Sequence, residues 1–239
     1  MGKQTVTAKS TRRSFGPGRS PLRQAQGARR RQLFNIWYHY STRLQRDVVL
    51  RSDVEFAHFC YLEGAENISR YELEPEPVVL VVDGHPQRTQ FDALVEFRDR
   101  APQLREVRTS ESQLSAREIS QRESQTQAAR EAGFEYVRIT WTELEEHTQL
   151  ICNWRAALAY LAAAREFPME QRCVELCTQL ARQRRCTLHQ LLSHTDPALR
   201  PLYLAALFKC LQEARLSSDL HAQPLCEASV ICLREAQHE

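Results

Sequence analysis

Residues 90–97 read Gln-Phe-Asp-Ala-Leu-Val-Glu-Phe, and residues 104–108 read Leu-Arg-Glu-Val-Arg. Both stretches are short, rich in apolar residues and bounded by polar sequence, which is typical of β-strands. Side chains alternate along a strand, so Glu106 and Arg108 should face one way and Val107 the other. We therefore predict two neighbouring strands, the second carrying an acid and a cation on a single face.

The segments before these strands predict a hairpin and a helix. Val78–Val82 is another apolar run, and the Asp83-Gly84 dipeptide after it favours a tight hairpin turn, so we expect the run to pair with residues 90–97. Arg51–Leu62 has apolar residues three to four apart, which indicates an amphipathic helix capped near Ser52. The sheet is thus expected to follow a helix.

The segments after the strands complete an α/β domain. Ser112–Ala132 is rich in Glu, Gln, Arg and Ala and ends before Gly133, which predicts a surface helix with a glycine stop. Tyr136–Ile139 reads as the next strand. A strand that follows a helix in this way implies a mixed sheet with helices on its faces. We expect this domain to span residues 34–147.

Beyond residue 147 the sequence predicts a smaller, mainly helical domain, residues 148–239. The expected helices are Leu150–Arg165, Met169–Gln183, Leu188–Leu192 and Ala198–Ala214. Two short apolar runs follow, Leu220–Leu225 and Ala228–Leu233, as a possible terminal β element. This order is that of a winged-helix module, whose helices enter a DNA groove or dock a partner. A helical appendage that only stabilises the first domain is the alternative.

The charge is unevenly distributed. Residues 1–46 contain eleven Lys and Arg and no acid, so the remaining 21 basic and 30 acidic residues give the rest of the chain a net charge of −9. Residues 1–33 have few large apolar side chains, and such a basic arm is expected to be disordered when free and to contact a phosphate backbone. A transit peptide or a solvated leader has the same composition.

Several function classes are disfavoured. No apolar run approaches the length of a membrane-spanning helix and no secretory signal is present, so we expect a cytoplasmic protein without a membrane partner. No Gly-rich phosphate loop occurs, which argues against an ATPase. The eight cysteines indicate buried thiols rather than disulfides. Cys173 and Cys177, with His189 downstream, leave a zinc site open as the less favoured interpretation.

Acidic residues on the predicted sheet suggest metal chemistry. Phosphodiester cleavage by metal ions needs carboxylates that converge on one point. Asp92 and Glu106 lie on neighbouring predicted strands, and Glu55 on the preceding helix can reach the same edge. Carboxylate oxygens are ligands for Mg²⁺ or Mn²⁺.

The order of these elements resembles the restriction-endonuclease-like PD-(D/E)xK nuclease fold. Within that fold the sequence resembles the TnsA family, the endonuclease subunit of heteromeric transposases, over about residues 35–147. The stretch Leu50–Glu55, followed by Cys60-Tyr61-Leu62-Glu63, is similar to the family's helix that bears the first catalytic Glu and to the Leu-Glu end of that helix. Residues 90–95 look like its Thr-x-Asp-Phe-Leu-Val strand, and residues 104–108 occupy the place of its Gln/Glu-Val-Lys strand.

The resemblance implies a function. Glu55, Asp92 and Glu106 would be the catalytic and metal-binding acids of a Mg²⁺- or Mn²⁺-dependent endonuclease that cuts the non-transferred strand at transposon ends. Arg108 would complete the centre where the family has lysine, and guanidinium, unlike ammonium, cannot act as a base.

The expected partners are double-stranded DNA, a DDE transposase subunit and an AAA+ ATPase regulator. The alternative that Arg108 leaves open is a weakened or inactive assembly subunit that binds DNA and recruits the transposase or its regulator. A stand-alone restriction or repair nuclease is disfavoured, since no obvious sequence-recognition domain is present.

Overall fold

The computed structural model describes residues 35–82, 85–109 and 116–234. Its elements in chain order are β1(Trp37–Ser41), β2(Arg46–Leu50), α2(Asp53–Gly64), β3(Ile68–Leu73), β4(Val78–Val82), β5(His85–Thr89), β6(Ala93–Phe97), β7(Gln103–Val107), α3(Ala116–Glu131), β8(Glu135–Ile139), α4(Trp141–Glu145), α5(Thr148–Ala163), α6(Glu170–Gln183), β9(Arg185–Thr187), α7(Leu188–Leu192), α8(Arg200–Gln212), β10(Leu216–Ser218) and β11(Val230–Leu233). The predicted basic arm, the Asp83-Gly84 turn and residues 112–115 of the predicted helix lie outside the described residues.

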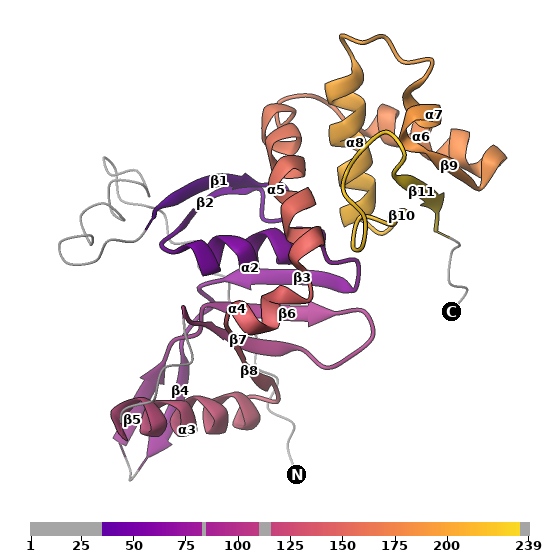
Figure 1. Cartoon of the computed structure of the whole chain (residues 1–239). Helices are drawn as coiled ribbons and strands as arrows, with labels where there is room; N and C mark the ends of the chain where they lie inside the picture. Colours follow the sequence, from indigo (N-terminus) through magenta and orange to yellow (C-terminus); the bar gives the residue numbers. More distant parts are fainter. Residues whose placement is uncertain (1–34, 83–84, 110–115, 235–239) are drawn as a thin grey trace.

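A four-stranded mixed sheet forms the centre of the first half of the chain. Its order is β3-β6-β7-β8, with only the β7–β8 pair parallel. Helix α2 covers one face, which contributes Ala93, Val95 and Val107 to the main core. Helix α3 covers the other, where Ala128 and Ala129 pack with Leu104 in a smaller core. Figure 1 shows the sheet between these two helices. The predicted mixed sheet flanked by helices is confirmed.

Helix α2 begins at a polar cap and ends at a close contact. The Ser52 hydroxyl accepts a hydrogen bond from the backbone N–H of Glu55, so the predicted cap is confirmed. Gly64 ends the helix against Trp154 of α5, and a Cβ there would lie 2.2 Å from a ring atom. A glycine is therefore required for α5 to pack this closely on α2.

The predicted hairpin has a different second strand. β4 pairs with β5, residues 85–89, and not with residues 90–97. Residues 90–92 are not in a strand, and β6 begins at Ala93 and pairs with β3 and β7. The polar sequence 85–89, which contains Pro86, was not recognised because proline is disfavoured inside sheets, although an edge strand in a two-stranded hairpin tolerates it. Asp92 therefore precedes its strand.

Three further strands, β1, β2 and β3, were not predicted. β1 and β2 form an antiparallel hairpin, and β1 contains the run Trp-Tyr-His-Tyr. These aromatic residues sit next to the basic arm, and that composition masked their strand character. β3 was also missed, because its alternation of polar and apolar residues is short and broken by charges.

The second half of the chain follows the sequence helix, strand, helix, helix, strand, strand after α5. These elements are α6, β9, α7, α8, β10 and β11, and the strands form an antiparallel sheet in the order β10-β11-β9. The four predicted helices are present, with shifted ends for all but Leu188–Leu192. Residues 220–225 form turns instead of a strand. β9 and β10 were missed because each has only three residues.

The two halves pack together through α5 and α8. Trp154, Leu158 and Phe208 of these helices belong to the same core as Phe59 and Leu62 of α2. None of the helices in the described residues is long and apolar enough to cross a bilayer.

Candidate active site

Asp92 directly precedes β6, and its backbone bonds to β7 on one side and to the residue that follows β3 on the other. Its backbone N–H donates to the carbonyl of Arg105 at 2.9 Å, and its carbonyl accepts from the N–H of Glu74 at 2.9 Å. Ala93 is opposite Arg105 in the antiparallel register, so Asp92 is opposite Glu106. Side chains directly opposite each other on antiparallel strands share one face of the sheet. The fold thus brings Asp92 and Glu106 to the same face.

The Asp92 carboxyl has a perturbed acidity. Burial raises its pKa to about 6, and the neighbouring carboxylates of Glu55 and Glu106 add to the rise. The backbone N–H of Val107, which donates to Oδ2 at 2.7 Å, and the guanidinium of Arg108 oppose it in part. An acid that is partly buried beside two other acids is stabilised by a nearby cation.

Glu106 is the most enclosed acid of the group, with 9% of its side chain exposed. Its Oε1 accepts hydrogen bonds from Arg108 and from the Gln125 amide at 3.1 Å. Its Oε2 accepts from the Tyr136 hydroxyl at 2.8 Å. Since α3 and β8 supply two of these donors, the position of Glu106 is fixed from three elements.

Arg108 follows the end of β7 and faces the same way as Glu106. Its side chain is 48% exposed and forms an ion pair with Glu106. Burial disfavours its charge, but the carboxylates of Glu106 and Asp92 outweigh this and raise its pKa. A guanidinium with a raised pKa stays charged at every physiological pH and cannot accept a proton.

Glu55 lies in the first turn of α2 and has a structural role there. Its Oε2 accepts from the backbone N–H of Arg51 at 2.8 Å, and its Oε1 accepts from the Ser52 hydroxyl at 3.2 Å. These contacts resemble a capping box, in which an acid satisfies free N–H groups before the helix. Glu55 is close enough to Asp92 to raise its pKa, so it borders the same site.

The three acids suit a hard divalent cation by their chemistry. Carboxylate oxygens are the preferred ligands of Mg²⁺ and Mn²⁺, and a bound cation would offset both the burial and the neighbouring negative charges that raise the pKa of Asp92. Within the described ranges, however, no group of three His, Cys, Asp or Glu side chains is already arranged to hold a metal ion. The oxygens of Glu55 and Glu106 are engaged by protein donors, so the metal site stays a prediction.

Sequence reasoning missed Gln125 and Tyr136. Gln125 is 2% exposed, and the Tyr136 hydroxyl donates to its Oε1 at 3.3 Å as well as to Glu106. Burial and the charge of Glu106 raise the pKa of Tyr136, so its hydroxyl remains a donor. The one available signal was a Gln placed eight residues before the Gly133 helix stop, which does not by itself indicate a site.

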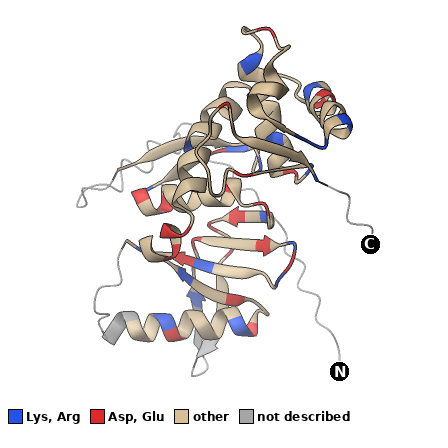
Figure 2. Cartoon of the chain, turned by 45° about the vertical axis from the view of Figure 1, so that its right-hand side comes forward, with Lys and Arg blue, Asp and Glu red and all other residues tan. Residues whose placement is uncertain are grey.

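The opposite face of β7 carries a cation in place of an acid. Arg105 is 4% exposed and donates to Gln103 Oε1 at 3.0 and 2.8 Å. It also lies 3.1 Å from Nε2 of the buried His58, whose pKa is lowered by burial and by this guanidinium. The strand therefore separates the buried Arg105 cation from the acidic site, and the charge colouring in Figure 2 shows acidic and basic segments on the same sheet.

Comparison with known proteins does not identify the chain. No protein-family model matches it. No curated protein matches it significantly either.

Proposed function

We propose that this chain is a metal-dependent DNA endonuclease subunit of a heteromeric transposase, and that it cleaves the non-transferred strand at transposon ends. The observation that carries the proposal is that Asp92 and Glu106 lie opposite each other on one face of a mixed sheet, with Arg108 paired to Glu106 and Glu55 near enough to raise the pKa of Asp92. Their order along the chain resembles the TnsA family. The proposed partners are duplex DNA, a DDE transposase and an AAA+ ATPase.

Each residue has a chemical role in this proposal. Asp92 and Glu106, with Glu55 at the rim, would hold Mg²⁺ or Mn²⁺, which supplies Lewis-acid activation of water when bound. Gln125 and Tyr136 orient Glu106 through hydrogen bonds. The exposed part of Arg108 is available to a phosphate, where its fixed charge stabilises the negative charge that develops during hydrolysis.

The second half supports a winged-helix assignment. Its order of helix, strand, helix, helix, strand, strand with β11 central is the arrangement expected of that module. Helix α8 would be the recognition helix, yet Ala205 to Gln212 are nearly all buried against the rest of the chain. Only its first turns are exposed enough to contact a groove.

The runner-up function is an assembly subunit without cleavage. It is favoured by one observation, which is that Arg108 cannot be a base and already forms an ion pair with Glu106. In that case the acids would be structural, and the chain would bind DNA and recruit the transposase or its regulator.

Strand nicking at transposon ends, measured with the cognate transposase present, separates these functions. We expect Asp92→Ala to abolish Mg²⁺- or Mn²⁺-dependent nicking, whereas Glu96→Ala, four residues further along in β6 and farther from the site, leaves it intact. Arg108→Lys should retain or increase cleavage and Arg108→Ala should reduce it, because arginine supplies only charge. Equal, metal-independent results for wild type and Asp92→Ala would favour the recruitment function.

A DNA-binding assay tests the role proposed for the basic arm. Deleting residues 1–31 removes nine of the eleven cations in residues 1–46. Because phosphate contacts release counterions, the slope of log affinity against log salt should become shallower. An unchanged slope would show that the arm does not contact DNA.

A further inference from the structure

Three exposed arginines lie where α6 turns into β9. Arg182 is in the last turn of α6, Arg184 directly follows the helix, and Arg185 begins β9. We call these three residues the α6–β9 corner. β9 is an edge strand of the sheet β10-β11-β9, so it leaves one side of the corner open. The corner therefore presents a dense group of positive charges at the surface of the second half of the chain.

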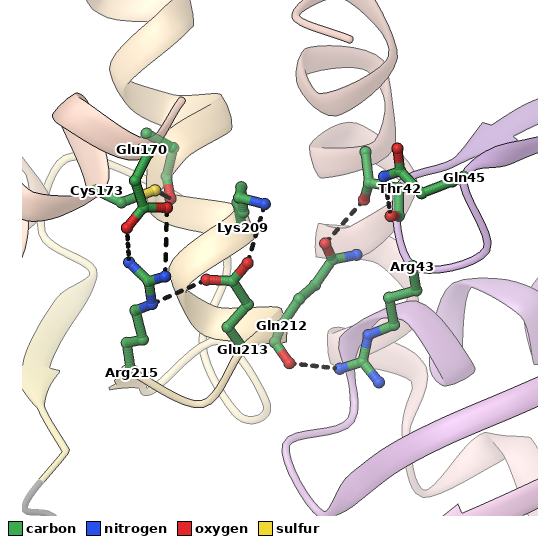
Figure 3. Close-up of polar contacts among 10 residues, drawn as sticks. Thr42, Arg43, Gln45, Glu170, Cys173, Lys209, Gln212, Glu213 and Arg215 are labelled. Carbon is green, nitrogen blue, oxygen red and sulfur yellow. Dashed lines mark hydrogen bonds and ion pairs between the residues drawn. The ribbon is translucent and has the colours of Figure 1, made fainter. Parts of the chain in front are cut away.

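The acids of the second half are engaged by other groups. Arg215 forms ion pairs with Glu170 and Glu213, and Lys209 pairs with Glu213 (Figure 3). The remaining acids in residues 148–234 contact Arg165 (Glu166), the Tyr203 hydroxyl (Glu175), the Ala198 N–H (Asp196), the Val230 N–H (Asp219) and His189 (Glu227). Within the described ranges, Arg182 and Arg185 therefore have no carboxylate partner.

Arg184 has a backbone conformation that usually belongs to glycine. Its φ is 60° and its ψ is −37°, and its N–H donates to the Leu180 carbonyl at 2.6 Å. Its own carbonyl accepts from the N–H of Leu233 of β11 at 3.2 Å, so the backbone is held from two sides. A side chain at positive φ is strained, and such strain is concentrated at functional sites. Because glycine ends a helix without this strain, the arginine side chain itself has a use here.

The other DNA-contacting parts of a winged-helix module are poorly suited to that role in this chain. Figure 1 shows α8 between α5 and α6, and Phe208 and Leu211 of α8 belong to the main core. The connection between β10 and β11, residues 219–229, contains two acids and neither Lys nor Arg. A phosphate backbone is attracted by cations, and that connection does not supply them. The α6–β9 corner does.

We propose that the α6–β9 corner binds the phosphate backbone of duplex DNA through the guanidinium groups of Arg182, Arg184 and Arg185. A guanidinium donates two parallel hydrogen bonds to phosphate oxygens and keeps its charge at every physiological pH. The contact reads no sequence, because all three groups bind the backbone. It gives the second half a DNA contact that does not use α8, and it rests on the proposed function only in the choice of DNA as the partner.

Binding of a fluorescently labelled duplex of arbitrary sequence to the full chain tests the proposal. The measurement is made by anisotropy in EDTA, so its result does not depend on whether Asp92 and Glu106 support cleavage. The double variant Arg182→Ala/Arg185→Ala should bind on the order of tenfold more weakly at low salt, and its slope of log affinity against log salt should be shallower by about two.

Two control variants decide whether the loss belongs to the corner. Arg165→Ala removes an exposed cation that is already paired with Glu166, and it should leave the affinity unchanged. Arg200→Ala removes the exposed cation at the start of α8. Equal affinities of the wild type and the double variant would overturn the proposal. An equal loss in Arg165→Ala, or a loss confined to Arg200→Ala, would also overturn it.

Arg184→Gly separates binding from folding. Glycine relieves the strain at positive φ, so the variant should unfold at the same temperature as the wild type or at a higher one. It should nevertheless bind the duplex severalfold more weakly, with a shallower salt slope, since one phosphate contact is lost. A stable variant with wild-type DNA affinity would contradict the role of Arg184, and so would a lower unfolding temperature.

Discussion

Helix α2 carries one glutamate in its first turn and another in its last turn, in contrasting surroundings. Glu55 borders Asp92, whose pKa is raised to about 6 by burial and further by the charges of Glu55 and Glu106. Glu63 has no exposed surface and accepts hydrogen bonds from Ser41, Tyr71 and Gln212. At the first turn of α2 a glutamate lies near other acids, whereas at the last turn a single glutamate is surrounded by hydrogen-bond donors.

The Glu63 cluster ties the two halves of the chain together. Gln212, 149 residues away, donates to Glu63 and accepts from the Thr42 hydroxyl through Oε1 at 2.8 Å. Its backbone carbonyl accepts from Arg43, which also bonds the carbonyl of Ile68 at 3.1 Å. Figure 3 shows Arg43 and Gln212 side by side. A carboxyl that is buried among neutral donors indicates a structural role, whereas a carboxyl that lies beside other acids indicates a functional one.

Truncating Glu63 should have the largest effect on stability. Glu63→Ala leaves the buried Ser41, Tyr71 and Gln212 donors without their acceptor, and we expect a loss of about 3–5 kcal/mol in the free energy of unfolding. Glu55→Ala removes only capping contacts at the other end of the helix and should cost about 1 kcal/mol. Urea denaturation of both variants measures the difference. Equal losses would remove the distinction between the two ends.

Asp92→Asn should instead stabilise the protein above pH 6. The folded pKa of about 6 exceeds the ordinary aspartate value of 3.8, so ionisation of Asp92 opposes folding fully above pH 6, progressively less between pH 6 and pH 4, and not at all below that range. Asparagine keeps an acceptor for the Val107 N–H without the charge. We expect a gain on the order of 1–2 kcal/mol at pH 8 that shrinks at pH 5. Destabilisation at pH 8 would contradict a raised pKa of Asp92 in the folded protein.

Tyr136→Phe should change the free energy of unfolding less than Glu63→Ala or Asp92→Asn does. It removes the hydroxyl that donates to Glu106 Oε2 and to Gln125, while the ring remains packed against Phe91. A loss of about 1 kcal/mol in the free energy of unfolding is expected for a partly buried hydrogen bond. An unchanged unfolding midpoint would mean that water replaces the hydroxyl, and that Tyr136 does not position Glu106.

Local chemistry made part of this structure predictable. Ser52 as a cap, the Gly133 stop with its positive φ of 82° and the alternation of Glu106 with Val107 all follow from neighbours in sequence. The residues that complete each cluster come from distant segments, such as Gln125 for Glu106 and Gln212 for Glu63. Periodicity cannot indicate such contacts, because they depend on how the helices pack on the sheet.

The position of Asp92 also depends on distant segments and could not be predicted from its neighbours in sequence. Its sequence neighbours predicted that Asp92 lies inside a strand, but β6 begins at Ala93, so Asp92 lies at the edge position directly before the strand. That edge position follows from the separate β4–β5 hairpin, which uses residues 85–89 as the partner of β4. A proline-containing edge strand could not be assigned from pattern alone.

Manganese binding to the full chain tests the central claim most directly, since it needs neither cognate DNA nor a partner protein. Isothermal titration should show saturable Mn²⁺ binding, with more protons released at pH 6 than at pH 8 because Asp92 must lose its proton. Asp92→Asn should weaken this binding by about tenfold or more, while Glu63→Gln at the other end of α2 should leave the affinity of the folded protein unchanged. Absence of saturable binding, or equal affinity in wild type and Asp92→Asn, would contradict the assignment of Asp92, Glu106 and Glu55 as a metal site.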